Sequence, residues 1–211
     1  MNLIAELEEA AHRVAAASAQ PSVRRSFSLW VGRPLAIVLG SLLVAVCAHV
    51  SIPLWFTPVP VTLQTFAVLL LGLLLSPEIA AGALLLYLGE GAAGLPVFSP
   101  QGPLGLAHLF GPTGGYLLAY PFAAAVTAWL RRRLASAWPE PSGFAASLAA
   151  AATGSFVILV AGAAWLAILT HRSPSVVLTL AVLPFLAGDT VKVAAAAAVA
   201  IALRPLRRSR P

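Results

Sequence analysis

Long apolar stretches, separated by short connections rich in Pro and Gly, set the pattern of this chain. Six of them approach the roughly 20 apolar residues that a helix needs to cross a bilayer. They lie at about residues 34–50, 62–76, 78–92, 114–130, 144–170 and 176–203. The second and third are short and only the dipeptide "PE" divides them, which predicts a tight helical hairpin. The pattern therefore predicts an all-α, integral membrane six-helix bundle.

Composition supports a membrane protein over a large soluble core. Hydrophobic residues make up 60% of the chain and charged residues only 9%, whereas a soluble domain is about half apolar and a quarter charged. The single cysteine, Cys47, lies inside an apolar stretch, so one chain cannot form a disulfide framework or a thiolate metal site. The four histidines are scattered over different segments, and no metal site is predicted.

The basic residues predict the orientation of the bundle. Every Lys and Arg except Arg172 and Lys192 lies before the first segment, after the fourth or after the sixth. With six crossings and cytoplasmic termini, all of these charges lie on the cytoplasmic side, as the positive-inside rule requires. The net charge of +6 is then a signal for topology and lipid headgroups, and nucleic-acid binding is not expected.

Three parts of the chain follow from this topology. Residues 34–205 are the predicted membrane domain, residues 1–33 a cytoplasmic N-terminal extension, and residues 206–211 a basic cytoplasmic tail. The extension lacks the basic start and apolar core of a secretory signal. Its Ala-rich sequence, with Glu9 and Arg13 four residues apart, favours a short helix.

Glu90, Asp189 and Lys192 are charged residues that lie within the apolar segments. Each costs about 2.5–3.5 kcal/mol at a helix centre on insertion scales, unless it faces the bundle interior and finds a partner. Asp189 and Lys192 are three residues apart and share a helix face. Pro184 is expected to start or kink that helix. Two interpretations stay open: a structural ion pair, or a binding site for a polar small molecule.

Uncharged polar residues gather at the same outer side. Thr62 and Thr113 are candidate helix caps, while Gln64 and Tyr116 fall in the first turns that follow. The second, fourth and sixth segments all start at the outer face, so their positive dipole ends favour a ligand with a carboxylate there. Capping for each Thr, and packing for Tyr116 and for Phe98 in the outer loop, are the structural alternatives.

Catalytic signatures are missing from the sequence. "GPTGGY" at 111–116 is Gly-rich, but neither it nor another stretch has the G-x-x-x-x-G-K-[ST] pattern of an ATPase phosphate loop. The chain is therefore not expected to hydrolyse ATP alone. No Ser/His/Asp arrangement can be drawn, and we predict that the chain is not an enzyme.

Four motifs in order carry a family resemblance. "PVPVTLQT" at 58–65, "GLPVF" at 94–98, "GPTGGYL" at 111–117 and "GDTVK" at 188–192 resemble the BioY family, the biotin-binding S components of energy-coupling factor (ECF) transporters. The resemblance covers about residues 34–205. It implies a six-helix bundle in the cytoplasmic membrane of a prokaryote, with a biotin pocket open to the outside. It also implies a transmembrane coupling protein and two cytoplasmic ATPase subunits as partners.

The resemblance assigns the D-x-x-K pattern, Asp189 and Lys192, to ligand binding. Biotin's ureido ring offers two N–H donors and one acceptor, which suit an acid and an amine. No cofactor is expected, since biotin is cargo. The predicted substrate-binding residues are Asp189, Lys192, Gln64, Tyr116, Phe98, Glu90, Thr62 and Thr113.

Further expectations concern other surfaces and other mechanisms. Trp55 and the Pro-rich loop 51–61 are expected to contact the apolar parts of the ligand. The small-x-x-x-small patterns that begin at Ala36 and Ser41 serve either docking to the coupling protein or packing within the bundle. Two rival functions stay open: a proton-coupled secondary carrier that uses Asp189 or Glu90 as a relay, and a membrane enzyme.

Overall fold

The structure is a computed structural model, and it describes residues 21–137 and 143–203. The predicted short helix around Glu9 and the predicted basic tail at 206–211 lie outside the described residues. The chain divides into two compact units, Met1–Ala36 and Ile37–Pro211. The first unit includes the start of helix α2, and the second unit includes the rest of the helices.

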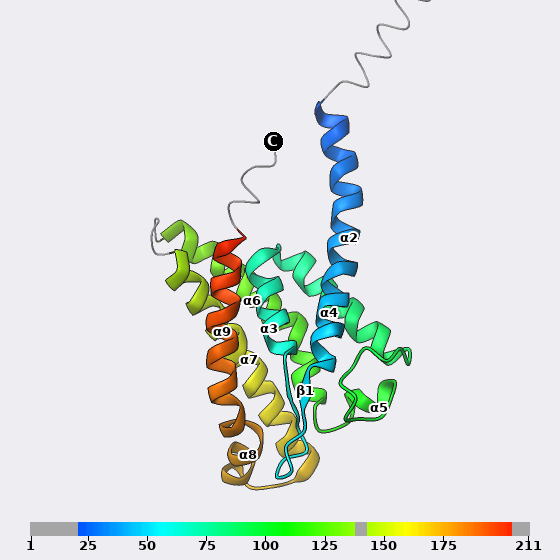
Figure 1. The fold of residues 1–211 in the computed structure, drawn as a ribbon, viewed down its shortest axis with the longest axis vertical. Coiled ribbons are helices and arrows are strands. Elements are labelled where there is room, and N and C mark those ends of the chain that lie inside the picture. Colours follow the sequence, from blue (N-terminus) through cyan, green and yellow to red (C-terminus); the bar gives the residue numbers. More distant parts are fainter. Residues whose placement is uncertain (1–20, 138–142, 204–211) are drawn as a thin grey trace, which may run out of the picture. The chain divides into compact units, whose positions relative to one another are not determined.

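The described residues are predominantly helical (Figure 1). Each of the six predicted segments contains a helix, although the first starts earlier than expected and the sixth is divided. The helices are α2 (Pro21–His49), α3 (Gln64–Leu74), α4 (Pro77–Ala92), α5 (Leu106–Leu109), α6 (Gly114–Ala137), α7 (Gly143–Thr170), α8 (Pro174–Ala181) and α9 (Leu183–Ala202). Among the described residues, three stretches are long and apolar enough to span a membrane: Gly32–His49, α7 and α9. The number of crossings and their orientation stay predictions.

The predicted hairpin between the second and third segments is present, and local capping explains it. Ser76 is the N-cap of α4, and its hydroxyl accepts a hydrogen bond from the backbone N–H of Ile79 at 3.4 Å. Pro77 occupies the first turn, where its missing N–H costs nothing. The residue before it is extended, as the residue before a proline usually is. Together these residues end α3 and begin α4 within two positions.

The sixth predicted segment is divided at Val182, whose backbone leaves the helical region (φ −126°, ψ −61°). Pro184 lies in the first turn of α9, so it starts this helix, one of the two outcomes expected from the sequence. The preceding residues form the separate helix α8. Asp189 consequently lies in the second turn of α9, near the end of the helix where the chain enters it.

The loop between the first two predicted segments folds as a small antiparallel hairpin. Strand β1 (Ser51–Ile52) pairs with β2 (Val61–Thr62), with Ser51 opposite Thr62. The Thr57 hydroxyl between the strands donates to the backbone carbonyl of Leu180 on α8 at 2.8 Å. The hairpin therefore connects the start of α3 with the α8 segment (Figure 1).

Glycines allow α3 and α7 to pack closely against α6. Gly72 of α3 and Gly154 of α7 both face Thr127 of α6: an added Cβ would lie 2.7 Å from the Thr127 Cβ and 2.1 Å from its hydroxyl, respectively. Such small-residue contacts let membrane helices approach closely. Large apolar side chains such as Phe122 and Phe156 are exposed on the bundle, which suits a lipid environment.

The small residues at 40, 41 and 45 of α2 pack within the bundle. All three are buried, and an added Cβ at Gly40 would lie 2.8 Å from the Cβ of Ala83 on α4. Leu39 and Leu42 are exposed instead. The small residues at 40, 41 and 45 therefore serve packing within the bundle, and they are not exposed for docking to a coupling protein.

Candidate ligand-binding pocket

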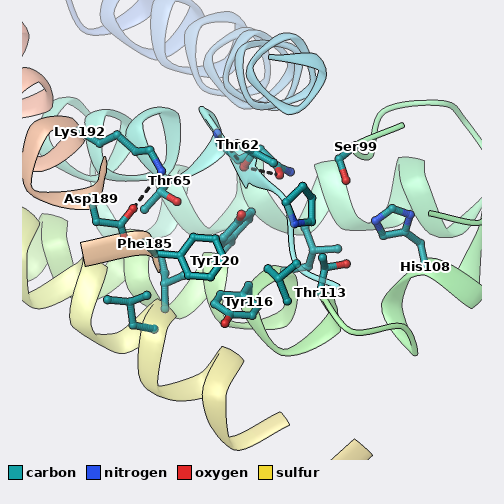
Figure 2. A pocket seen from close by; sticks show the side chains of 16 residues that line it. Thr62, Thr65, Ser99, His108, Thr113, Tyr116, Tyr120, Phe185, Asp189 and Lys192 are labelled. Carbon is teal, nitrogen blue, oxygen red and sulfur yellow. Dashed lines mark hydrogen bonds and ion pairs between the residues drawn. The ribbon is translucent and has the colours of Figure 1, made fainter. Parts of the chain in front are cut away.

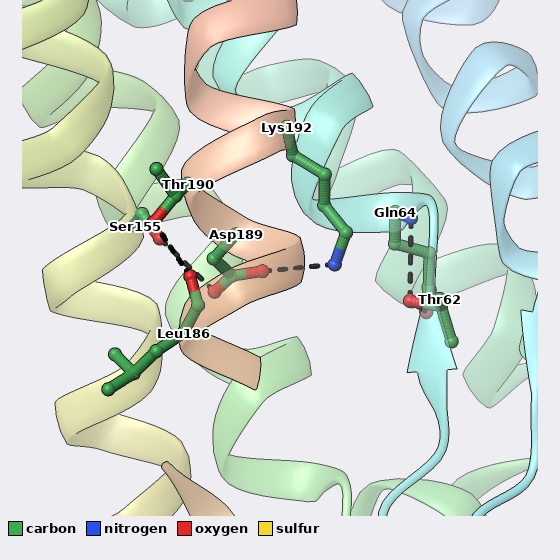
Figure 3. A network of polar contacts seen from close by, with 7 residues as sticks. All are labelled: Thr62, Gln64, Ser155, Leu186, Asp189, Thr190 and Lys192. Atoms are coloured by element: carbon green, nitrogen blue, oxygen red, sulfur yellow. Dashed lines mark hydrogen bonds and ion pairs between the residues drawn. The ribbon is translucent and has the colours of Figure 1, made fainter. Parts of the chain in front are cut away.

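Asp189 and Lys192 form a buried ion pair on α9. The Lys192 amine lies 2.9 Å from Asp189 Oδ1, and the two residues are 9% and 5% exposed, respectively. Ser155 of α7 donates to the second carboxylate oxygen at 3.2 Å. Figure 3 shows the amine of Lys192 pointing from α9 toward Thr62 and Gln64 at the start of α3. Both charges are thus partnered inside the bundle, as their insertion cost requires.

The same ion pair lines a cavity, so the structural ion pair is present, and the binding site for a polar small molecule stays a prediction. The cavity offers about 490 Å³ of empty space, a volume that includes solvent at its mouth. Its lining comes from the hairpin end, α3, the 93–113 loop, α5, α6, α7 and α9 (Figure 2). The lining residues are Val59, Pro60, Thr62, Gln64, Thr65, Ser99, His108, Thr113, Tyr116, Leu117, Tyr120, Ile158, Leu159, Phe185, Asp189 and Lys192.

A polar network holds the amide of Gln64 in this wall. The Thr62 hydroxyl donates to Gln64 Oε1 at 3.0 Å, and Gln64 Nε2 donates to the Tyr87 hydroxyl at 2.6 Å. Thr62 is not the N-cap of α3 that the sequence predicted, because Leu63 occupies that position. Its hydroxyl instead accepts from the backbone N–H of Gln64 at 3.4 Å. The network therefore fixes the orientation of the amide.

Aromatic side chains form the middle of the cavity. The Tyr116 hydroxyl donates to the backbone carbonyl of Ala181 at 2.6 Å, and its ring centroid lies 6.1 Å from that of Phe185. Tyr120 lies beside them (Figure 2). Tyr116 was predicted from the sequence as a substrate-binding residue, whereas Tyr120 and Phe185 were missed. Spacing could have found them, because Tyr120 is four residues after Tyr116 and Phe185 four residues before Asp189, each on one helix face.

Ser99, His108 and Thr113 gather at the opposite end of the cavity from the ion pair (Figure 2). The Thr113 carbonyl accepts the backbone N–H groups of Tyr116 and Leu117 at 3.1 and 3.2 Å. The side-chain cap predicted for Thr113 is not among the hydrogen bonds of the described residues. Ser99 and His108 were not predicted, since loop residues follow no periodicity that would reveal their direction.

Glu90, Phe98 and Trp55 are not among the residues that line the cavity, and their contact with the ligand stays a prediction. The carboxylate of Glu90 accepts a hydrogen bond from Ser41 on α2. Phe98 packs behind the wall, with ring centroids 5.4 Å from Tyr87 and 4.9 Å from His108. Trp55 is 96% exposed on the hairpin loop. Their chemistry was suitable, but the fold turns each of them toward another surface.

Metal binding has no support within residues 21–137 and 143–203. No three His, Cys, Asp or Glu side chains come close enough together there to hold an ion. The pocket's polar groups are an ion pair, amide and hydroxyl groups, an imidazole and aromatic hydroxyls. This set recognises an organic molecule by hydrogen bonds and apolar contact.

A bundle of membrane-length apolar helices around a pocket with a buried ion pair defines a membrane protein that binds a small polar molecule. The model of the BioY family matches residues 19–209. The chain belongs to the BioY family. This is a family of transporters, which confirms the prediction that the chain is not an enzyme.

Relatives and a solved structure agree with this membership. The "Probable biotin transporter BioY" of Pyrococcus horikoshii is 36% identical over 164 residues, 78% of this chain and 91% of the relative. The "Biotin transporter BioY2" of Lactococcus lactis is 36% identical over 156 residues, 74% and 81% of the two chains. The crystal structure of an "S-component for biotin from an ECF-type ABC transporter" matches with a TM-score of 0.75 over 87% of this chain and 94% of that one. At 23% identity, this last match shows a shared fold.

Proposed function

We propose that this chain is the substrate-specific subunit of an ECF-type ABC transporter and captures biotin for uptake across the cytoplasmic membrane of a prokaryote. The single observation that carries the proposal is the Asp189–Lys192 ion pair, which lines a cavity in a member of the BioY family. The relatives described above, which are named as biotin transporters, support the choice of ligand.

The chemistry of the ion pair suits the ureido ring of biotin. Asp189 accepts hydrogen bonds, so it matches the ring's N–H groups, while Lys192 donates and matches the carbonyl. Because the pair is close to neutral as a unit, it favours a neutral group with both donors and an acceptor. Gln64 adds an amide that is able to do either. The apolar ring and chain of biotin then pack against Tyr116, Tyr120 and Phe185.

The topology that completes this proposal has six crossings, with both termini in the cytoplasm. Residues 1–33 form the cytoplasmic extension, 34–205 the membrane domain and 206–211 the basic tail. Two observations support it: Arg131–Arg133 lie toward the end of α6, and α3, α6 and α9 contribute residues near their starts to the cavity. In that orientation the pocket lies toward the outer face and the arginines lie toward the cytoplasm.

Transport requires partners, because this sequence has no ATPase phosphate loop. We propose a transmembrane coupling protein and two cytoplasmic ATPase subunits, whose hydrolysis of ATP drives the bundle to turn and release its ligand inward. No bond of biotin changes and no cofactor takes part. The lipid bilayer is the remaining partner, contacted by exposed side chains such as Phe122 and Phe156.

The direct test is equilibrium binding to the purified chain in detergent. We expect saturable binding of one biotin per chain by isothermal titration calorimetry, and biotin as the molecule that copurifies from cells and is identified by mass spectrometry. Binding of another vitamin, together with no measurable binding of biotin, would refute the proposed ligand. Biotin uptake by vesicles that contain this chain alone, abolished when the proton gradient collapses, would favour a secondary carrier instead.

A further inference from the structure

His108 closes the end of the cavity that lies away from the ion pair. It is 3% exposed, and it lines the cavity together with Ser99 and Thr113. Figure 2 shows these three side chains at one end and Asp189 with Lys192 at the other, with the aromatic side chains between them. A ligand that fills the cavity therefore meets two chemically different polar ends.

The imidazole of His108 is held rigidly by the loop before it. Its Nδ1 lies 2.9 Å from the backbone carbonyl of Pro103, and its ring centroid lies 4.9 Å from that of Phe98. An added Cβ at Gly102 would lie 2.6 Å from the ring, so the loop packs directly against it. A carbonyl only accepts hydrogen bonds, and Nδ1 consequently carries a proton.

The other ring nitrogen, Nε2, is free to meet a ligand. The hydrogen bonds among residues 21–137 and 143–203 give it no protein partner. When the ring is protonated, Nε2–H is a charged donor, and its hydrogen bond to an anion is stronger than one between neutral groups. The hydroxyl groups of Ser99 and Thr113 stand beside it as further donors.

The charges of the pocket decide which end of an acidic ligand lies here. A carboxylate placed at the ion pair would meet the negative charge of Asp189 as well as the amine of Lys192. At the other end it meets His108, two hydroxyl groups and the start of α6, a helix of 24 residues. The dipole of such a helix favours an anion near its start, although the backbone N–H groups of Gly114, Tyr116 and Leu117 already donate to carbonyl groups.

We propose that His108, with Ser99 and Thr113, binds the carboxylate of the ligand and makes the pocket selective for the free acid over neutral derivatives. The inference rests on the proposed function, since biotin carries one carboxylate on its side chain. The imidazolium donates from Nε2 to a carboxylate oxygen, while Nδ1 keeps its bond to Pro103. His108 is then a specificity-determining residue at the opposite end from the D-x-x-K pair.

A dependence on pH follows from this arrangement. Residues 93–113, which pack against the ring, contain no Asp, Glu, Lys or Arg. Within the cavity the other ionisable groups are Asp189 and Lys192 at the far end and the hydroxyls of Tyr116 and Tyr120, while Glu90 on α4 is bonded to Ser41. Because a carboxylate accepts a stronger hydrogen bond from a protonated ring than from a neutral one, affinity for the acid falls when a rise in pH removes that proton.

The test compares biotin with biotinamide, in which a neutral carboxamide replaces the carboxylate. His108→Asn retains a donor near the position of Nδ1 and removes Nε2, whereas His108→Gln places a neutral nitrogen near Nε2. His49→Asn is the matched control, because the Nδ1 of His49 also lies 2.9 Å from a backbone carbonyl, that of Ala45, but outside the cavity. Affinities are measured by calorimetry at about pH 6 and pH 8.

We expect the unmodified chain and His49→Asn to bind biotin about tenfold more tightly than biotinamide at the lower pH, as the loss of a charge-assisted hydrogen bond predicts. In His108→Asn this preference falls to about one and the pH dependence is lost, because affinity for biotin falls by more than affinity for biotinamide. His108→Gln loses the pH dependence as well, and it decides the question if the Asn variant does not fold. A preference retained in the variants would overturn the inference, while an unmodified chain that binds neither ligand would overturn the proposed function itself.

Discussion

Removing the ion pair one partner at a time, and then together, separates its structural role from its role in binding. Asp189→Asn leaves the Lys192 amine without its carboxylate, and Lys192→Met leaves the carboxylate with Ser155 as its remaining partner. Breaking a buried pair in this way costs about 3–5 kcal/mol. We expect values near the lower end of that range, because both side chains border a cavity that water enters.

The double variant Asp189→Asn/Lys192→Met removes both charges, so no unpaired buried charge is left. Replacement of a whole buried pair is often close to neutral for stability. We therefore expect thermal unfolding in detergent, followed by tryptophan fluorescence, to recover most of the loss seen in each single variant. Biotin affinity does not recover: it falls by more than tenfold in Asp189→Asn and stays low in the double variant.

The test is whether the double variant recovers thermal stability without recovering biotin affinity. Glu90→Gln is the control, because this acid is bonded to Ser41 and does not line the cavity, and we expect its biotin affinity to be unchanged. The reasoning is refuted if the double variant recovers both stability and biotin affinity. That outcome would make the pair a purely structural element beside a pocket that functions without it.

Three further changes test other parts of the account. Gly154→Ala places a Cβ 2.1 Å from the Thr127 hydroxyl, and we expect it to destabilise the bundle by about 1–3 kcal/mol in thermal unfolding, a loss that Thr127→Ala relieves; equal loss in both backgrounds would contradict this. Tyr87→Phe removes the acceptor of the Gln64 amide, so biotin affinity should fall roughly two- to tenfold with little change in melting temperature; unaltered affinity would argue against a role for the amide. Thr57→Val breaks the bond between the hairpin loop and α8, and stopped-flow measurements should show faster biotin dissociation, by a similar factor; an unchanged rate would show that the loop does not retain the ligand.

The helices were largely predictable because apolar stretches and their breaking residues mark them. The predicted segment at 144–170 corresponds to α7 (Gly143–Thr170), and the one at 78–92 to α4 (Pro77–Ala92). The early start of α2 at Pro21 was missed, because a helix that continues beyond an apolar stretch leaves no change in hydropathy where it begins. The β1–β2 hairpin was also missed, since two-residue strands are too short to show an alternating pattern.

The sequence revealed the site residues whose charges are costly inside an apolar segment. It did not reveal the site residues whose positions depend on how a loop folds. Asp189 and Lys192 were selected because charges inside an apolar segment need a reason, and both line the cavity. Glu90 was chosen by the same cost argument, but α2 supplies its partner. His108 was passed over, because only the folded 93–113 loop turns it into the pocket.

The most direct measurement is a crystal structure of the chain with biotin bound. We expect biotin in the cavity between α3, α6, α7 and α9, with its ureido nitrogen and oxygen atoms within hydrogen-bond distance of Asp189 and Lys192. We also expect the carboxylate of biotin beside Nε2 of His108. Biotin bound at another place, or in this cavity with the ion pair untouched, would contradict the central claim.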